Sequence, residues 1–188
     1  MFKLAGVVLI LSVLVSENSA LITRAQWGAR TSKSVSKFSG QIPYVVIHHT
    51  YEPAVCLTTE DCIAAMQYIQ DLHMDQNGWG DIGYSFAVGG DGEIYEGRGW
   101  NVVGAHAPGY NSKSVGIVFI GDYRTDLPSF KMLKAAVDFI AAGVTTGLIA
   151  PDYKLIGHRQ AKATECPGDR LFSEIITWDH WTASPTPN

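Results

Sequence analysis

One histidine and one cysteine near the end of the sequence have the side chains of metal ligands. His158 follows a short apolar run, as a residue at the end of a strand would, and Cys166 precedes the turn signal Pro167-Gly168. A loop between them could therefore bring an imidazole and a thiol round one ion. Two ligands do not hold a catalytic zinc, so a further nitrogen ligand is expected from elsewhere in the chain.

A candidate for this ligand ends another apolar run. Residues 44–47 are apolar and precede His48 and His49, as expected where a buried strand runs out into a site. Neighbours in a strand face opposite sides, so the two histidines cannot both face one ion, and we assign His48 as the ligand. His48, His158 and Cys166 leave a fourth position for water, which is typical of a catalytic zinc site rather than a structural one.

The same residues admit two other interpretations. Cys166 could be a thiol nucleophile with His158 as its base, which would cleave an amide without a metal. A free cysteine is also often a small, buried hydrophobic residue with no chemical role. The spacing of these residues leaves both alternatives open.

The chain opens with the features of a secretory signal peptide. A lysine near the start, an apolar centre at residues 4–15 and a small-residue end predict a signal peptide at 1–20. The alternative, an N-terminal membrane anchor, is disfavoured because the apolar centre is short and no basic flank follows it. We expect a secreted, extracellular protein with no membrane span after signal removal, one domain at residues 21–182 and a flexible tail at 183–188.

The overall charge is mildly acidic, with a formal net charge of −4. Removal of a signal peptide takes away Lys3 and Glu17, one charge of each sign, so this balance does not change. The sequence contains no basic stripe or arginine-rich run, which argues against nucleic acid as a partner.

The other two cysteines, Cys56 and Cys62, are close together before an amphipathic segment. In an oxidising compartment they are expected to form a local disulfide that ties the loop after the His48 strand to the next helix. The alternative is a pair of free, buried thiols. With a disulfide formed, Cys166 is the odd thiol of a secreted protein, and metal ligation would give it a role.

Hydrophobic periodicity predicts a single α/β domain with a mixed central β-sheet flanked by helices. Apolar residues repeat at helical spacing after a Thr58 or Thr59 cap, up to Asn77-Gly78, and again from Ser129. Two alternating runs joined by a glycine-rich turn predict a hairpin. Beyond the first helix, the expected elements are strands at 84–88, 93–96, 115–120 (buried on both faces) and 153–156, and helices at 129–147 and 170–178.

Several blocks of sequence resemble the peptidoglycan recognition proteins of the short, secreted insect type. They are residues 46–50, 79–86, 89–101, 104–107 and 157–168, and the resemblance extends from about residue 24 to 181. It implies the zinc amidase fold, with Zn²⁺ held by His48, His158 and Cys166. It also implies catalytic positions at Tyr84 and Thr164. Tyr84 would donate a hydrogen bond to the zinc water and the developing oxyanion, and Thr164 would orient substrate or water.

The resemblance also implies a peptide-binding groove. It places His49, Thr50, His73 and His106 among the substrate-binding residues, although His49 and His106 could instead support a metal ligand or fill the core. Three further positions match members that favour meso-diaminopimelic acid in the stem peptide: Gly78, Trp79 and Arg98. Alternatively, Arg98 is a solvated turn residue and Trp79 packs under the hairpin.

These inferences together predict a secreted, zinc-dependent N-acetylmuramoyl-L-alanine amidase that acts in innate immunity. Such an enzyme binds bacterial peptidoglycan and hydrolyses the amide between the muramyl lactyl group and L-alanine. The alternative is a non-catalytic pattern-recognition receptor that uses the same groove. Cys166 favours the enzyme, because family members that only bind and signal typically lack this cysteine.

Overall fold

The structure is a computed structural model that describes residues 19–185. The predicted signal peptide falls almost entirely before residue 19 and the end of the predicted tail falls on residues 186–188. Both therefore lie outside the described residues and stay predictions. Within residues 19–185, no helix is both long enough and apolar enough to cross a membrane.

A six-stranded mixed sheet forms the centre of the described chain, with the strand order β1-β4-β3-β5-β2-β6. β3 and β4 form the predicted antiparallel hairpin, whereas β2 lies between β5 and β6 with parallel pairing on both sides. The strands are β1 (Leu21–Ile22), β2 (Ile42–His49), β3 (Phe86–Val88), β4 (Ile94–Glu96), β5 (Ser114–Phe119) and β6 (Ile149–Gly157).

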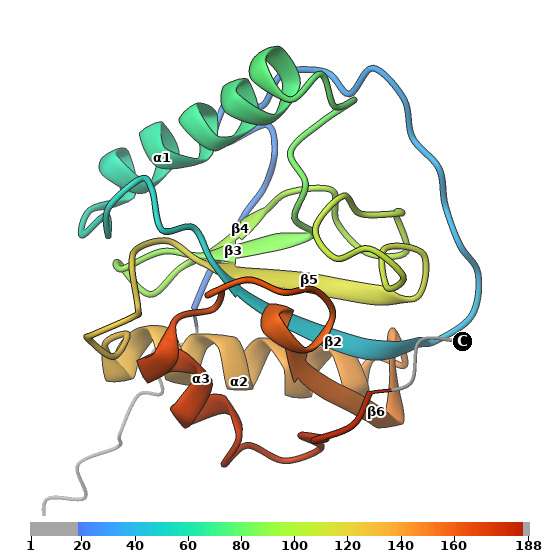
Figure 1. The fold of residues 1–188 in the computed structure, drawn as a ribbon. Coiled ribbons are helices and arrows are strands. Elements are labelled where there is room, and N and C mark those ends of the chain that lie inside the picture. Colours follow the sequence, from blue (N-terminus) through green and yellow to red (C-terminus); the bar gives the residue numbers. More distant parts are fainter. Residues whose placement is uncertain (1–18, 186–188) are drawn as a thin grey trace, which may run out of the picture.

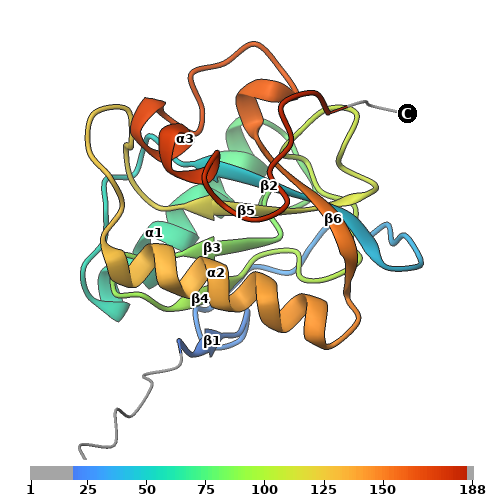
Figure 2. The ribbon, with the colours of Figure 1, turned by 90° about the horizontal axis from the view of Figure 1, so that it is seen from below.

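Helices cover both faces of this sheet. In Figure 1, α1 lies above the sheet, and α2 and α3 lie below it. Figure 2 shows α2 running across the lower face. This arrangement confirms the predicted fold class. The helical elements are α1 (Thr59–Asp71), the π-helical turn η1 (Leu72–Gln76), α2 (Phe130–Thr145), the 3-10 turn η2 (His158–Gln160) and α3 (Asp169–Ile175).

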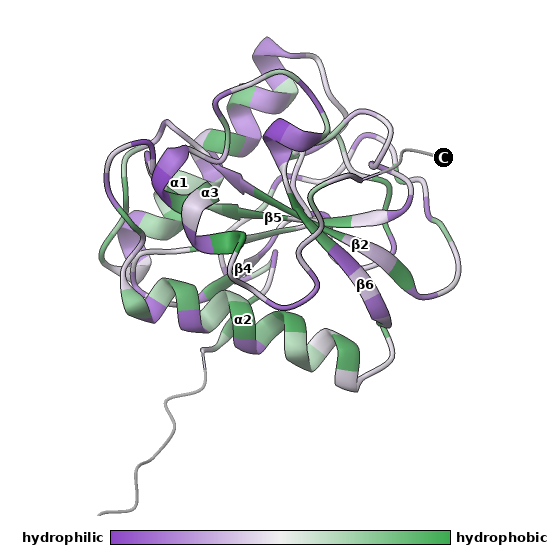
Figure 3. Ribbon diagram, turned by 60° about the horizontal axis from the view of Figure 1, so that its bottom comes forward, coloured by the Kyte–Doolittle hydropathy of each residue, from purple (hydrophilic) through white to green (hydrophobic). Residues whose placement is uncertain are grey.

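The pleat of the central strands directs their side chains into separate core clusters on the two faces of the sheet. Val45 and Ile47 of β2 pack in one cluster with Met132 of α2. Val118 of β5 faces the opposite side, in a cluster with Ile69 of α1. All residues of β5 are buried, as predicted for a strand covered on both faces, and Figure 3 shows the hydrophobic character of β5 and of much of α2.

Both long helices begin at side-chain caps, of which the one at Thr58 was predicted. The side chain of Thr58 accepts a hydrogen bond from the backbone N–H of Asp61, and that of Ser129 accepts one from Met132. The first helical segment continues past α1 through η1 and stops before Gly78, whose φ is 69°. Glycine adopts this left-handed conformation without a steric cost, so it ends the helix where the sequence indicated.

Two predicted boundaries differ from the structure by more than two residues. β6 begins at Ile149, earlier than the predicted start at residue 153, and it includes Pro151. Proline is tolerated there because β6 is the last strand of the sheet, where an N–H is not needed on the open side. α3 ends at Ile175 rather than near 178. The chain turns there instead, and the Thr177 hydroxyl donates to the carbonyl of Glu174.

Cys56 and Cys62 form the predicted disulfide. Cys62 lies in the first turn of α1, and Cys56 lies in the loop that follows β2. Both are buried against Met66 and Ile69 of α1. Cys166 is the free cysteine of the described residues. The bridge therefore fixes the loop that leaves the candidate site.

Removal of the α2 cap tests the energetic role of Ser129. Ser129→Ala deletes the oxygen that accepts the Met132 N–H at 3.3 Å, and we expect the free energy of unfolding to fall by about 1 kcal/mol. Equilibrium unfolding in urea measures this loss. Ser173→Ala is the matched control, since its exposed hydroxyl bonds only to the Asp169 carbonyl, and a change within about 0.5 kcal/mol is expected. Equal losses in the two variants would contradict the capping role.

Candidate functional site

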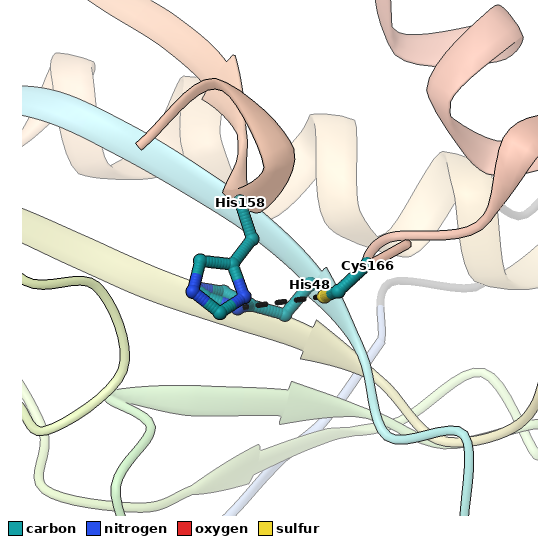
Figure 4. A group of neighbouring side chains, drawn as sticks. All are labelled: His48, His158 and Cys166. Carbon is teal, nitrogen blue, oxygen red and sulfur yellow. Dashed lines mark hydrogen bonds between the residues drawn. The ribbon is translucent and has the colours of Figure 1, made fainter. Parts of the chain in front are cut away.

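Three segments bring the predicted ligands together at one end of the central strands. His48 is the next-to-last residue of β2, His158 begins η2 directly after β6, and Cys166 lies in the loop before α3. One ligand atom from each lies within 4.8 Å of the others. The Cys166 Sγ is 3.8 Å from His48 Nδ1, and Figure 4 shows both the His158 ring and the Cys166 sulfur pointing toward His48.

The pleat of β2 decides which of the two neighbouring histidines faces this group. His48 is the Cα partner of Val118 in β5, whose side chain lies on the α1 face of the sheet. His49 faces the opposite way, where its Nδ1 accepts a hydrogen bond from the Tyr123 N–H at 3.1 Å and lies 3.8 Å from Asp122. The alternation of β2 therefore places His48, and not His49, with His158 and Cys166.

Burial keeps both imidazoles of this group neutral. It lowers the pKa of His48 well below its usual value, and the neighbouring histidines His106, His158 and His49 add to this effect. The pKa of His158 falls to about 4, again mainly through burial. A neutral imidazole keeps a lone pair on one ring nitrogen, which is the form that binds a metal.

The pKa of the Cys166 thiol is shifted in the opposite direction. Burial raises its pKa to about 12, although the backbone N–H of His49 donates to the sulfur at 3.4 Å. A cysteine nucleophile needs a lowered pKa and a cationic neighbour, and His158 is neutral, so this site does not favour a thiolate-imidazolium pair. Two neutral imidazoles and one thiol fit zinc, whose charge would favour the deprotonated sulfur.

The two predicted catalytic side chains lie beside this group. The ring centroid of Tyr84 is 5.3 Å from that of His48. Burial and then the neighbouring Cys166 raise the pKa of the Tyr84 phenol, so the hydroxyl stays protonated and can donate a hydrogen bond. Thr164 Oγ1 accepts the Cys166 N–H at 3.2 Å, which leaves its own proton for another acceptor.

A cavity of about 470 Å³ opens over these residues. It includes Thr50 and His49 from the predicted set, together with Tyr84, His158, Thr164 and Cys166. A larger cavity of about 540 Å³ lies between α2, β6 and residues 177–180, but the candidate metal ligands of the described chain do not line it. The smaller cavity is therefore the one that adjoins the candidate metal ligands.

The sequence did not single out three further side chains at this cavity. Arg124 lies with its guanidinium 4.5 Å from the centre of the Tyr51 ring, and it forms ion pairs with Asp122 at 2.8 Å and Glu165 at 3.6 Å. Tyr51, Arg124 and Glu165 all line the cavity. A signal was available, because Asp122 and Arg124 come shortly after the buried strand β5, as His158 comes directly after β6.

The rings of Tyr84, His73 and Trp79 form an aromatic wall that begins at the cavity and includes two of the predicted groove residues. The His73 ring lies 5.6 Å from that of Tyr84 and 4.6 Å from that of Trp79. His73 is buried, its Nδ1 accepts the Gly83 N–H at 2.9 Å, and burial followed by the charge of Arg98 lowers its pKa to about 4. His73 is therefore a neutral member of this wall.

Arg98 is half-buried and partly committed to the protein. Its Nε donates to the carbonyl of Ile82 at 2.6 Å, and its Nη1 donates to that of Val103 at 2.7 Å. Among the described residues, its Nη2 has no hydrogen-bond partner. The two carbonyls therefore fix the guanidinium, and Nη2 remains as a donor for a bound anion.

His106 lies on the far side of His48 from the sulfur. Its Nδ1 is 3.0 Å from His48 Nε2, whereas it is His48 Nδ1 that faces Cys166. Its Nε2 is 3.5 Å from the hydroxyl of Ser114, and its exposed fraction is 6%. Of the residues predicted to bind substrate, His106 is therefore the one placed behind a candidate metal ligand, His48.

Comparisons with known proteins agree with this geometry. Residues 38–169 match the family described as N-acetylmuramoyl-L-alanine amidase, Amidase_2. Peptidoglycan-recognition protein LB of Drosophila melanogaster is 61% identical over 162 residues, which cover 86% of this chain and 70% of that protein.

Solved structures give the same result. A tyrosine-to-phenylalanine mutant of Drosophila PGRP-LB, in complex with tracheal cytotoxin, matches with a TM-score of 0.86 and 60% identity over 86% of this chain and 96% of that chain. Peptidoglycan recognition protein-LE, in complex with the same compound, described as monomeric diaminopimelic acid-type peptidoglycan, matches with a TM-score of 0.85 and 41% identity over 87% and 96%. The chain therefore belongs to the N-acetylmuramoyl-L-alanine amidase family and, within it, to the peptidoglycan recognition proteins.

Proposed function

We propose that this protein is a secreted, zinc-dependent N-acetylmuramoyl-L-alanine amidase. The observation that carries the proposal is the convergence of His48, His158 and Cys166 from three segments, with their ligand atoms within 4.8 Å of one another. Three protein ligands beside an open cavity match a catalytic zinc site, whereas a structural site would have four. The reaction proposed is hydrolysis of the amide between the muramyl lactyl group and L-alanine of peptidoglycan.

The roles of the residues follow from the donors and acceptors that they present. When bound, zinc activates water and polarises the scissile carbonyl. Tyr84, protonated and beside His48, donates to the oxygen on which negative charge develops. Thr164 accepts the Cys166 N–H and so turns its hydroxyl proton toward water or substrate. The buried imidazoles stay neutral, which keeps their lone pairs available for the metal.

The aromatic wall and Arg98 support meso-diaminopimelic acid-type peptidoglycan as the substrate. We propose that the stem peptide runs from the cavity, past His49 and Thr50, along His73 and Trp79. Gly78 turns the backbone before Trp79, and the backbone N–H of Trp79 donates to the carbonyl of His73. Arg98 would then meet the additional carboxylate of diaminopimelic acid, which a lysine-type stem lacks.

Several features support action outside the cell, in innate immunity. The predicted signal peptide implies export, and the Cys56–Cys62 disulfide is the kind of bond that persists in oxidising compartments. Two relatives, PGRP-LB and PGRP-LE, have been solved in complex with tracheal cytotoxin, a monomeric diaminopimelic acid-type peptidoglycan. The receptor alternative uses the same groove, so binding alone does not separate it from the enzyme. Only hydrolysis does.

The first test replaces the sulfur ligand. Cys166→Ser should lose most bound zinc and all hydrolysis, while it keeps muropeptide binding, because most of the groove lies on other residues. Mass spectrometry of the stem peptide released from purified peptidoglycan, together with zinc per chain, measures both. Tyr84→Phe is the matched comparison. It should keep zinc but lower turnover by roughly a hundred-fold or more, since one oxyanion donor is gone.

Three outcomes would change this assignment. A parent protein that binds muropeptides but releases no stem peptide would support the receptor. Hydrolysis that survives chelation but is lost on thiol alkylation would make Cys166 a nucleophile. Loss of folding and binding together in Cys166→Ser would make the cysteine structural.

The second test concerns substrate preference. Arg98→Ala should reduce the preference for diaminopimelic acid-type over lysine-type muropeptides, because a hydrogen bond to a charged group contributes about 1.5 to 3 kcal/mol, or roughly ten-fold to a hundred-fold in affinity. Calorimetric affinities for both ligands give the ratio, which is insensitive to a general loss of stability. Arg170→Ala, an exposed change on α3, should leave the ratio unaltered. Equal affinities of the parent for both ligands would refute the assignment.

A further inference from the structure

The ring of His106 lies in a slot that two glycines create. A Cβ added at Gly116 of β5 would lie 2.6 Å from ring atoms of His106, and one added at Gly104 would lie 2.4 Å from its Cδ2. Real Cβ atoms do not approach other atoms this closely, and neither glycine has a positive φ. The close approach of the ring, rather than an unusual backbone conformation, therefore requires glycine at both positions.

The backbone that carries His106 is also fixed. The side-chain carbonyl of Asn111 accepts the N–H groups of His106 at 2.8 Å and Ala107 at 2.9 Å. The backbone carbonyl of Asn111 accepts the Gly104 N–H at 2.9 Å. One residue thus holds the loop on both sides of the histidine. The imidazole has a defined position before any ligand arrives.

The hydrogen bonds beyond this ring define where its proton lies. Ser114 donates its single hydroxyl proton to the carbonyl of Tyr110 at 2.8 Å, and a carbonyl can only accept. The Ser114 oxygen, 3.5 Å from His106 Nε2, can therefore only accept from the ring. This order places the proton of His106 on Nε2 and leaves a lone pair on Nδ1.

The same logic extends one ring further, to His48. The His106 Nδ1 lone pair faces His48 Nε2 at 3.0 Å, so His48 must donate from Nε2. A neutral imidazole carries one ring proton, so the other nitrogen of His48 keeps its lone pair. That nitrogen is Nδ1, the atom 3.8 Å from the Cys166 sulfur. The carbonyl of Tyr110, acting through Ser114 and His106, thus determines that the lone pair of His48 is on Nδ1.

We propose that His106 is a positioning residue that, through Ser114, holds His48 in the Nε2–H tautomer with Nδ1 directed at the metal position. The part of this inference that concerns zinc rests on the proposed function, whereas the tautomer of His48 does not. Metal-bound histidines usually donate their second N–H to a carboxylate, a backbone carbonyl or water. Here an ordered chain of a histidine, a serine and a carbonyl has that role. The nearly complete burial of His106 and the engagement of both its nitrogens favour this role over direct contact with substrate.

Zinc affinity of four variants tests the proposal without any activity measurement. A chromogenic chelator in competition with the purified protein gives the zinc dissociation constant at one pH. His106→Ala should weaken binding by roughly ten-fold to a hundred-fold, the usual effect of losing such a partner. Ser114→Ala should weaken it less. His106→Asn places a carbonyl oxygen near the Nδ1 position and should recover most of the affinity. His180→Ala, an exposed histidine that stacks on Tyr153, should have no effect.

These variants also separate positioning from general support of the fold. Thermal unfolding of the zinc-free proteins shows whether a variant is merely less stable. His106→Asn and His106→Ala should differ in zinc affinity even where their unfolding temperatures agree. Affinity unchanged in His106→Ala, or equally weak in His106→Asn, would overturn the proposal while the proposed amidase function stands.

The tautomer itself is measured by nitrogen NMR of ¹⁵N-histidine-labelled, zinc-free protein. The parent should show the His48 proton on Nε2, and His106→Ala should show a mixture of both tautomers. A parent with the His48 proton on Nδ1 would overturn the inference. This measurement decides it even if the parent binds no zinc, in which case the metal part of the proposed function fails separately.

Discussion

The parallel register of β2 between β5 and β6 is the constraint on which the site depends. Ile47 pairs with Gly157 of β6, so His48 lies beside His158, the first residue after β6. The same strand pairs His48 with Val118 of β5 and so directs it to the α1 face. A slip of one residue would turn every side chain of β2 to the other face. His49 would then take the place of His48, and the polar His48 would face the α2 side. The packing of Val45 and Ile47 therefore fixes the direction of the His48 side chain as well as the fold.

The third candidate ligand, Cys166, is positioned differently, because no strand of the described residues carries it. The loop after η2 is held at its end by Gly168, whose φ is 91°, and whose Cβ, if present, would lie 2.3 Å from the backbone of Tyr123. The backbone N–H of Arg170 then donates to the carbonyl of Tyr123. These contacts fix Cys166 against the end of β2, where the His49 N–H donates to its sulfur. The sulfur is thus located by turn and backbone contacts, and the imidazoles by strand register.

The sequence predicted those parts of the structure that have a local or periodic cause. Period-two alternation separated His48 from His49, and the Thr58 cap and the helical spacing from Ser129 marked two helix starts. Short spacing in a chain with a predicted signal peptide predicted the Cys56–Cys62 bridge. The first part of β6 was missed because Pro151 is a strand breaker except at a sheet edge, and edge position is a property of the whole sheet.

The parts of the site that were missed depend on distant contacts. Ser114 begins β5 and has no motif of its own, and its role appears only when the His106 ring lies against Gly116. For His106, the sequence left both substrate binding and support of a metal ligand open, because a motif locates a residue in a site without showing which way its ring nitrogens point. Arg124 joins the cavity through Tyr51, to which no periodicity connects it. Side-chain partners, unlike strand and helix positions, are set by the assembled fold.

The central claim is that His48, His158 and Cys166 hold one zinc ion and leave a position open. X-ray absorption at the zinc edge, on protein loaded with one equivalent of zinc, tests it most directly. A zinc ion held by these three residues should show one sulfur at about 2.3 Å and nitrogen or oxygen ligands at about 2.0–2.1 Å, two of them with the outer-shell scattering of imidazole. The sulfur should disappear in Cys166→Ser. A shell without sulfur in the parent, or a shell of four protein ligands with no place for water, would rule out this open three-ligand site.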